Sequence, residues 1–310
     1  MTGKVRSNYG AIIQRKRAFR TVALLLVFVL IVSSLIFTVF AWRNRGNGIN
    51  RSTVDGLWKD GEYASVQALS SEALAAKPLD PYWLILHGFS AFQIAAAQIG
   101  AEQEESYIDA SIRSLRKALL VGAGRNESSV RYVLGKAYYR KGEAYADLAV
   151  EQFELASAAS YRPEDLDEYL GLAYAALRKY RESVIAFSRA LGDDPSDLLV
   201  LSIARSYLEL GESEAAKAYL VRLIGNSKDI AIVIKSRTLL GRLLLESGEL
   251  EAAEGHFLAA LEADEGNADV HLALGDLYET KGDAIKARAE WRRSVRIDPA
   301  NENARSRLSS

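Results

Sequence analysis

The 310-residue sequence contains no cysteine, only five prolines and only three histidines. The absence of cysteine excludes disulfide bonds, thiolate zinc sites and cysteine nucleophiles. The three histidines, His87, His256 and His271, fall in different segments and show no HExxH spacing. Hydrophobic residues make up 49% of the chain and charged residues 25%, which is typical of an ordered and here predominantly helical protein. We therefore expect no metal site.

Patterns that support catalysis are also missing. The VGAG stretch at residues 121–124 lacks the flanking strand that a dinucleotide or phosphate loop requires. The acidic pairs at 104–105 and 193–194 have no accompanying nucleophile. We therefore interpret them as solvated charges in loops or at helix ends. We predict that the protein is not an enzyme and binds no cofactor.

Acidic residues are missing from one end of the chain. Residues 1–51 carry nine Lys or Arg and no Asp or Glu, which leaves 30 basic and 40 acidic residues from residue 52 onward. Non-specific nucleic-acid binding depends on phosphate neutralisation by cations. The acidic body therefore predicts no nucleic-acid partner.

One long hydrophobic run is present, at residues 21–42 (TVALLLVFVLIVSSLIFTVFAW). As a helix it would span about 33 Å, enough to cross a bilayer. Six Lys or Arg precede it and three follow it, which favours an N-terminus inside. The pattern predicts a basic cytoplasmic tail at 1–20, a transmembrane helix at 21–42 and a linker at 43–51. The protein would then be a single-pass protein of the cytoplasmic (inner) membrane with a periplasmic body.

Residues 268–301 read as two amphipathic helices joined by a turn. Gly275 leaves room for the next helix to approach, and Tyr278 is expected to wedge into that contact. Ala287 keeps the helix pair close, and Trp291 fills the space beneath it. Gly282 can take the left-handed conformation that ends the first helix. Pro299 stops the second helix before another unit can begin.

The same spacing recurs upstream, and the first copy has an abbreviated first helix. In the copy at 164–196, Arg178 stands where the turn glycine is expected. This turn is therefore either differently closed or strained, since a positive φ at a non-glycine residue costs about 1–2 kcal/mol. The copy at 81–127 holds about ten extra residues, and 302–310 is expected to be a C-terminal tail. The predicted units are 52–80, 81–127, 128–163, 164–196, 197–233, 234–267 and 268–301.

This spacing, with Leu274, Gly275, Tyr278, Gly282, Ala287, Trp291 and Pro299 in the last unit, resembles the tetratricopeptide repeat (TPR) residue for residue. The resemblance implies an all-α fold: a membrane-spanning helix followed by a right-handed TPR α-solenoid of about seven helical hairpins. It also implies a bacterial membrane-anchored protein with a concave groove, lined by the first helix of each pair.

The groove positions of the family predict the protein-binding residues. An apolar and aromatic groove flanked by cations suits an extended peptide or an amphipathic helix with acidic edges. The alternative is that these side chains pack against neighbouring helices, or that the extra residues of the second unit cover them. The Lys and Asn pair with which some TPR proteins hold chaperone tails is absent. The candidate site residues are Tyr82, Ile85, Phe89, Phe92, Tyr132, Lys136, Tyr139, Arg140, Leu172, Leu201, Arg205, Leu208, Lys235 and Arg242.

The expected function is that of a non-enzymatic, membrane-tethered scaffold or adaptor that binds a protein partner during assembly of envelope complexes. Two alternatives stay open. The chain could be a structural subunit of an envelope assembly, such as a periplasmic ring or collar of a flagellar motor, or of a secretion or pilus system. It could instead be an accessory subunit that docks substrates for an enzyme. Self-association into a homo-oligomer is compatible with each.

Overall fold

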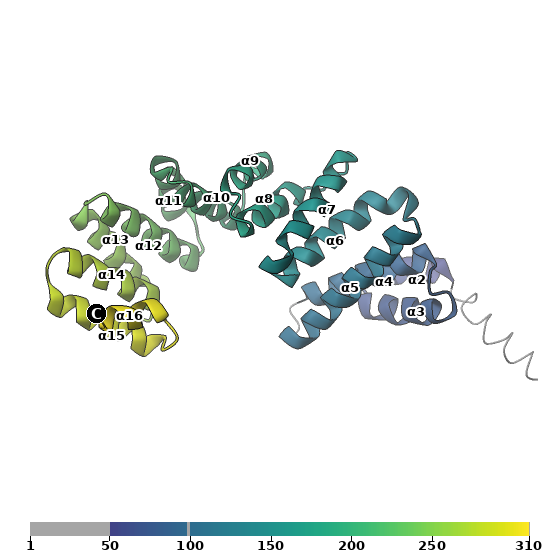
Figure 1. Cartoon of the computed structure of the whole chain (residues 1–310), viewed down its shortest axis with the longest axis horizontal. Coiled ribbons are helices and arrows are strands. Elements are labelled where there is room, and N and C mark those ends of the chain that lie inside the picture. The colour runs from purple at the N-terminus through teal and green to yellow at the C-terminus, as the bar shows by residue number, and fades with distance from the viewer. Residues whose placement is uncertain (1–49, 98–99, 310) are drawn as a thin grey trace, which may run out of the picture. The chain divides into compact units, whose positions relative to one another are not determined.

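The computed structural model describes residues 50–97 and 100–309, and within these ranges the regular structure is entirely helical. The chain divides into two compact units, with the boundary between Ala137 and Tyr138. Figure 1 shows the helices of both units in chain order. The first unit holds α2 (Arg51–Lys59), α3 (Tyr63–Ala76), α4 (Pro81–Ala96), α5 (Ala101–Val121), the 3-10 turn η1 (Gly124–Asn126) and most of α6 (Glu127–Lys141).

The second unit begins in the last turn of α6 and continues to the end of the described chain. Its elements are the 3-10 turn η2 (Glu143–Tyr145), α7 (Ala146–Ala158), α8 (Leu166–Ala176), α9 (Tyr180–Ala190), α10 (Asp197–Glu209), α11 (Ser213–Asn226), α12 (Ile230–Glu246), α13 (Leu250–Ala263), α14 (Ala268–Thr280), α15 (Ala284–Ile297) and α16 (Glu302–Ser309).

Consecutive helices pack as hairpins. In the second unit α8 packs against α9, α10 against α11, α12 against α13 and α14 against α15. The first helices of these pairs also touch one another, α8 with α10, α10 with α12, and α12 with α14. We call the surface formed by α8, α10, α12 and α14 the first-helix face. Because every helix contacts its sequence neighbours, the unit has the nearest-neighbour organisation of a repeat array.

Side-chain caps determine where the first helices begin. Ser196 Oγ accepts a hydrogen bond from the backbone N–H of Leu199 at 3.2 Å, and this bond starts α10. Asp229 Oδ1 accepts from Ala231 N at 2.9 Å at the start of α12. Asn267 Oδ1 accepts from Val270 N in the same way at the start of α14. These caps satisfy backbone donors that have no partner within the helix.

Helices α14 and α15 approach closely at Gly275 as predicted from the sequence, but the side chain that lies against Gly275 is Trp291 and not Tyr278. A β-carbon at Gly275 would overlap the indole ring of Trp291 at Cδ1 and Nε1. Trp291 is only 4% exposed and packs with Leu272, Ala287 and residues of α16. The absence of a side chain at residue 275 therefore allows the two helices to come together around a large aromatic ring.

The predicted conformational role of the turn residues is also confirmed. Gly282 has a φ of 78°, and the backbone N–H of Asp283 donates to Tyr278 O at 2.8 Å. Arg178 has a φ of 57° and closes its turn in the same manner, with Lys179 N donating to Tyr174 O at 2.9 Å. Arg178 thus takes the left-handed conformation without being glycine, which stores about 1–2 kcal/mol of local strain.

The last described element, α16, was not predicted from the sequence. Ala304 is fully buried, and Leu308 packs against the cluster that contains Trp291. Trp291 Nε1 donates to Asp276 Oδ1 at 3.1 Å, and Arg307 Nε donates to the same oxygen at 2.9 Å. The helix therefore covers the apolar end of the array that α14 and α15 would otherwise expose.

The membrane part of the predicted fold class and the predicted localisation require correction. No helix within residues 50–97 and 100–309 is long and apolar enough to cross a membrane. The longest of them, α5, has 21 residues but carries four acidic and three basic side chains. The predicted span at 21–42 lies outside the described residues, as does the tail at 1–20. The structure therefore supports an all-α repeat array, and a single-pass protein of the inner membrane is not supported.

Candidate functional site

The four predicted site residues on α4 are buried or half-buried within the first unit. Ile85 and Phe92 are only 7% and 6% exposed and belong to the core. Tyr82 is half-buried, with its Oη donating to Asp55 Oδ1 at 3.4 Å. Phe89 is also half-buried. These aromatic side chains contribute to packing, and Ile85 and Phe92 present little surface to a partner.

Tyr132 and Lys136 lie on α6, close to Phe92 of α4. Lys136 Nζ donates to Tyr132 Oη at 3.2 Å and lies 5.7 Å from the centre of the Phe92 ring. A cation over an aromatic face gains electrostatic stabilisation. Of the predicted residues of the first unit, these three are brought into one cluster.

In the second unit, five predicted residues stabilise helix contacts or lie next to them. Leu201 is 4% exposed and sits in the core, and Leu208 packs against the same core cluster. Leu172 packs against the cluster of Phe187. The Tyr139 ring meets the Tyr169 ring edge to face at 5.7 Å. Burial, followed by the neighbouring Tyr169 and Glu168, raises the pKa of Tyr139. Arg140, beside Tyr139, is half-buried.

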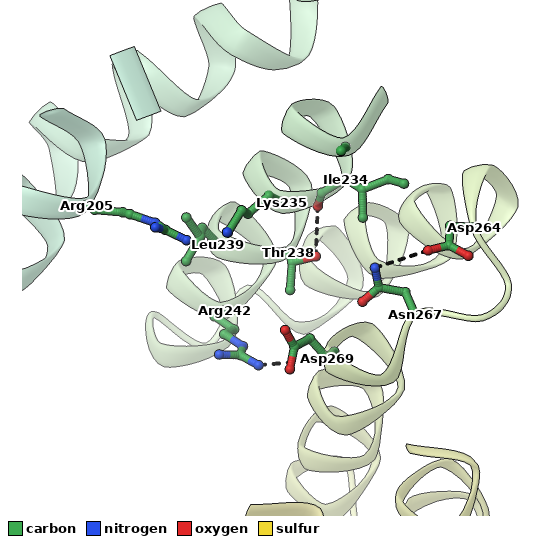
Figure 2. A pocket seen from close by; sticks show the side chains of 10 residues that line it. Arg205, Ile234, Lys235, Thr238, Leu239, Arg242, Asp264, Asn267 and Asp269 are labelled. Carbon is green, nitrogen blue, oxygen red and sulfur yellow. Dashed lines mark hydrogen bonds between the residues drawn. The ribbon is translucent and has the colours of Figure 1, made fainter. Parts of the chain in front are cut away.

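Arg205, Lys235 and Arg242, the remaining three predicted residues, are brought together in one pocket on the first-helix face (Figure 2). The pocket has a volume of about 310 Å³. Arg205 comes from α10, and Lys235 and Arg242 come from α12. Its other lining residues are Ala231, Ile234, Thr238 and Leu239 of α12, with Asp264, Asn267 and Asp269 around the start of α14.

No carboxylate of the described part of the chain pairs with any of these three cations. Arg205 and Lys235 are exposed, and in Figure 2 their charged ends point toward the same part of the pocket. Arg242 Nη2 makes one long hydrogen bond, 3.5 Å, to the backbone oxygen of Asp269. Asp264 instead accepts from Gly266 N at 3.0 Å, which ties its carboxylate to its own loop. The pocket therefore has an uncompensated positive side.

A second pocket, of about 340 Å³, also has Arg242 in its lining. Its apolar lining residues are Leu245 of α12 and Leu272 and Ala273 of α14. Its polar lining residues are Glu246 of α12, Asp276 of α14, and Asn303, Ser306 and Arg307 of α16. The two pockets share Arg242, so they form one groove on the first-helix face, and we call it the Arg242 groove. The last helix of the chain closes one end of this groove.

Sequence reasoning missed the loop residues Asp264 and Asn267 and all of α16. It considered only positions inside the first helices, although Asn267 could have been recognised as the cap preceding residue 268. Arg307 had no repeat position to mark it. The sequence therefore located the cationic wall of the groove but not its opposite wall or its end.

Two of the three histidines have hydrogen-bond partners, whereas Nδ1 of His256 is buried without one in the described chain. His87 lies between Gln67 Nε2 and Ser114 Oγ, at 2.9 Å from each. His271 Nδ1 lies 2.6 Å from Glu290 Oε2 in the interior between α14 and α15. Within residues 50–97 and 100–309, no group of three or more His, Asp or Glu side chains is placed to hold a metal ion.

Two stretches of the second unit match family models described as tetratricopeptide repeat, at residues 200–229 and 238–302. This chain is a tetratricopeptide-repeat protein. The matched stretches contain Arg205 and Arg242, whereas Ala231, Ile234 and Lys235 of the pocket lie between the two stretches. The TPR fold is typical of scaffolds for protein–protein interaction. No curated protein matches its sequence.

Solved structures resemble this TPR protein in fold. The C-terminal part of a TPR repeat-containing protein from Cytophaga hutchinsonii has a TM-score of 0.58 and 16% identity, covering 84% of this chain and 99% of that one. A tetratricopeptide repeat protein from Parabacteroides merdae has a TM-score of 0.54 and 14% identity, covering 83% and 95%. Pseudomonas aeruginosa pilF has a TM-score of 0.52 and 16% identity, covering 72% and 96%. At these identities the similarity shows the fold alone.

Proposed function

We propose that this TPR protein is a non-enzymatic scaffold that binds a protein partner through the first-helix face of its second unit. The observation that carries the proposal is the Arg242 groove, where three cations of two helices line one pocket without an acidic partner in the described chain. Ordinary surface cations gain little from pairing, but cations gathered in a concave site can be desolvated together by a ligand.

The predicted groove residues of the first unit form a less suitable docking surface than the Arg242 groove. Its predicted residues Ile85 and Phe92 are in the core, and Lys136 already contacts Tyr132 and Phe92. A partner would find preformed side-chain contacts there, whereas the Arg242 groove is open. We therefore assign partner binding to the second unit.

In-cell photo-crosslinking tests this proposal. A photoreactive amino acid is introduced at Arg205, Lys235 or Arg242, and captured proteins are identified by mass spectrometry. Arg222, an exposed cation on α11, is the matched control. We expect the same partner from the three groove positions and not from Arg222. Equal capture from Arg222 would overturn the assignment, and so would capture only of a second copy of this chain, which would favour a structural assembly.

A further inference from the structure

We propose that the Arg242 groove selects an extended acidic segment of the partner protein, in which an acidic and an apolar residue stand two positions apart. This inference rests on the proposed function and specifies the chemistry of the partner. In it, a carboxylate enters the pocket lined by Arg205, Lys235 and Arg242, and the apolar side chain packs against Leu245 and Leu272 in the neighbouring pocket. That pocket is also lined by Glu246 and by Asp276, whose Oδ1 already accepts hydrogen bonds from Trp291 and Arg307.

The charge arrangement points to an anion. Arg205 and Lys235 belong to different helices, and like charges that share a pocket repel each other unless an opposite charge lies between them. Within the described chain no carboxylate fills that role for either residue. A bound carboxylate would accept hydrogen bonds from both side chains, and an arginine can bind it through two parallel N–H donors.

The surroundings make this cation cluster selective. The chain from residue 52 onward carries 40 acidic and 30 basic residues, so its net charge is negative and disfavours an acidic ligand on average. A cationic cleft on such a body attracts an anion to one place and disfavours attachment elsewhere. The apolar lining of the first pocket, Ile234 and Leu239, can cover the methylene groups of a Glu side chain.

The size and order of the two pockets favour an extended segment. Their volumes are about 310 and 340 Å³, and Arg242 lines both. In an extended chain, alternate side chains point to the same side. Residues two positions apart can therefore fill adjacent pockets, whereas α16 with Arg307 limits how far the segment can continue.

The arrangement differs from a clamp made of Lys and Asn on one helix. The corresponding pairs here are Leu201 with Arg205 on α10 and Thr238 with Arg242 on α12. Leu201 is buried, and the Thr238 hydroxyl donates to Ile234 O at 2.8 Å. The cations of the Arg242 groove therefore come from two helices, α10 and α12, whereas the Lys and Asn of such a clamp come from one.

Fluorescence anisotropy with the purified full chain tests the inference. The probe is a fluorescein-labelled ten-residue peptide in which Glu and Leu recur two positions apart, separated by Ser. Matched peptides replace every Glu by Gln, or every Leu by Ser. We expect the Glu and Leu peptide to bind at least 10-fold more tightly than the Gln peptide and several-fold more tightly than the Leu-free peptide, with affinity falling as salt is added.

Charge reversal locates the binding. Arg205→Glu and Arg242→Glu should each lower the affinity for the acidic peptide at least 10-fold, whereas Arg222→Glu on α11 should change this affinity less than two-fold. Circular dichroism melts verify that each variant is folded, because Arg205 is exposed and Arg242 half-buried. Equal affinity for the Gln peptide, or equal loss in Arg222→Glu, would overturn the inference. Equally tight binding of a single-stranded oligonucleotide would also overturn it by showing unselective attraction of anions.

The two proposals can fail separately. If crosslinking captures a partner from the groove but charge reversal at Arg205 leaves that capture unchanged, the scaffold function stands and the acidic segment is wrong. If no partner is captured from any groove position although the acidic peptide binds at Arg205 and Arg242, the peptide chemistry stands and the scaffold function is wrong.

Discussion

Gly275 of α14 and Trp291 of α15 are in such close contact that a β-carbon at residue 275 would overlap the indole ring. The ring is held in place because its Nε1 donates to Asp276 Oδ1 at 3.1 Å. A methyl group at this position therefore cannot be accommodated by a simple rotation of Trp291.

Gly275→Ala should destabilise the protein by about 1–3 kcal/mol, since overpacking a rigid contact outweighs the better helix propensity of Ala. Thermal or urea denaturation measures the change. Gly255→Ala in α13 is the matched control, because nothing lies within 4 Å of the added β-carbon. That control should raise stability by up to about 1 kcal/mol. If the two variants are equally stable, the contact is not a constraint on the helix pair.

Arg178→Gly should stabilise the fourth predicted repeat. Arg178 has a φ of 57°, and glycine takes this conformation without the steric cost of about 1–2 kcal/mol. Because glycine also has more freedom in the unfolded chain, the expected net gain is about 1 kcal/mol, measured as a higher denaturation midpoint. Gly282→Arg, at a φ of 78°, should reverse the effect by a similar amount. A loss of stability in Arg178→Gly would show that the arginine side chain contributes more than its strain costs.

Stability should fall as the pH is lowered below 6.5, partly because of His87. Gln67 Nε2 can only donate, so His87 Nε2 accepts and the neutral ring donates from Nδ1 to Ser114 Oγ. Burial, followed by the Arg113 charge, lowers the pKa of His87 from 6.5. The unfolded chain therefore takes up a proton first, and the stabilisation present above pH 6.5 is lost as the pH falls toward the lowered value.

Melting curves between pH 8 and pH 5 test this dependence. His87→Gln should reduce the loss of melting temperature between these limits relative to the unaltered protein. His256→Gln should reduce it as well, because burial, followed by the Arg237 charge, lowers the pKa of His256 too. An unchanged pH dependence in both variants would assign the acid sensitivity to carboxylates instead.

Ala304→Asp should detach α16 from the end of the array. Ala304 is fully buried against the cluster of Leu272 and Trp291, and a buried carboxylate without a partner costs about 2 kcal/mol or more. Hydrogen exchange should become faster in α16 and α15 before it does in α10. Asn303→Asp adds the same charge at an exposed position and should leave exchange unchanged. Equal protection in both variants would mean that α16 is not held by its apolar face.

The sequence contained enough information for the helix pairs and their contacts. Gly275, Gly282 and Trp291 each have a local role that the spacing alone indicates, because a turn needs a positive φ and a close helix contact needs a missing side chain. For the same reason the turn at Arg178 could be identified as either strained or differently closed, and its φ of 57° decides for strain. Arg205, Lys235 and Arg242 could be placed on one face from repeat position.

Other features depended on the tertiary structure. The position of a residue in the repeat does not determine how deeply its side chain is buried. Only the packing of the helices showed that Ile85, Phe92 and Leu201 are buried, whereas Arg205 and Lys235 remain exposed. The opposite wall of the pocket comes from a loop near Asn267, which follows no repeat period. The helix α16 is too short to be stable alone and forms because Ala304 and Leu308 find the apolar end of the preceding repeat. Sequence thus determined which residues occupy equivalent positions, and long-range packing decided which of them reach a partner.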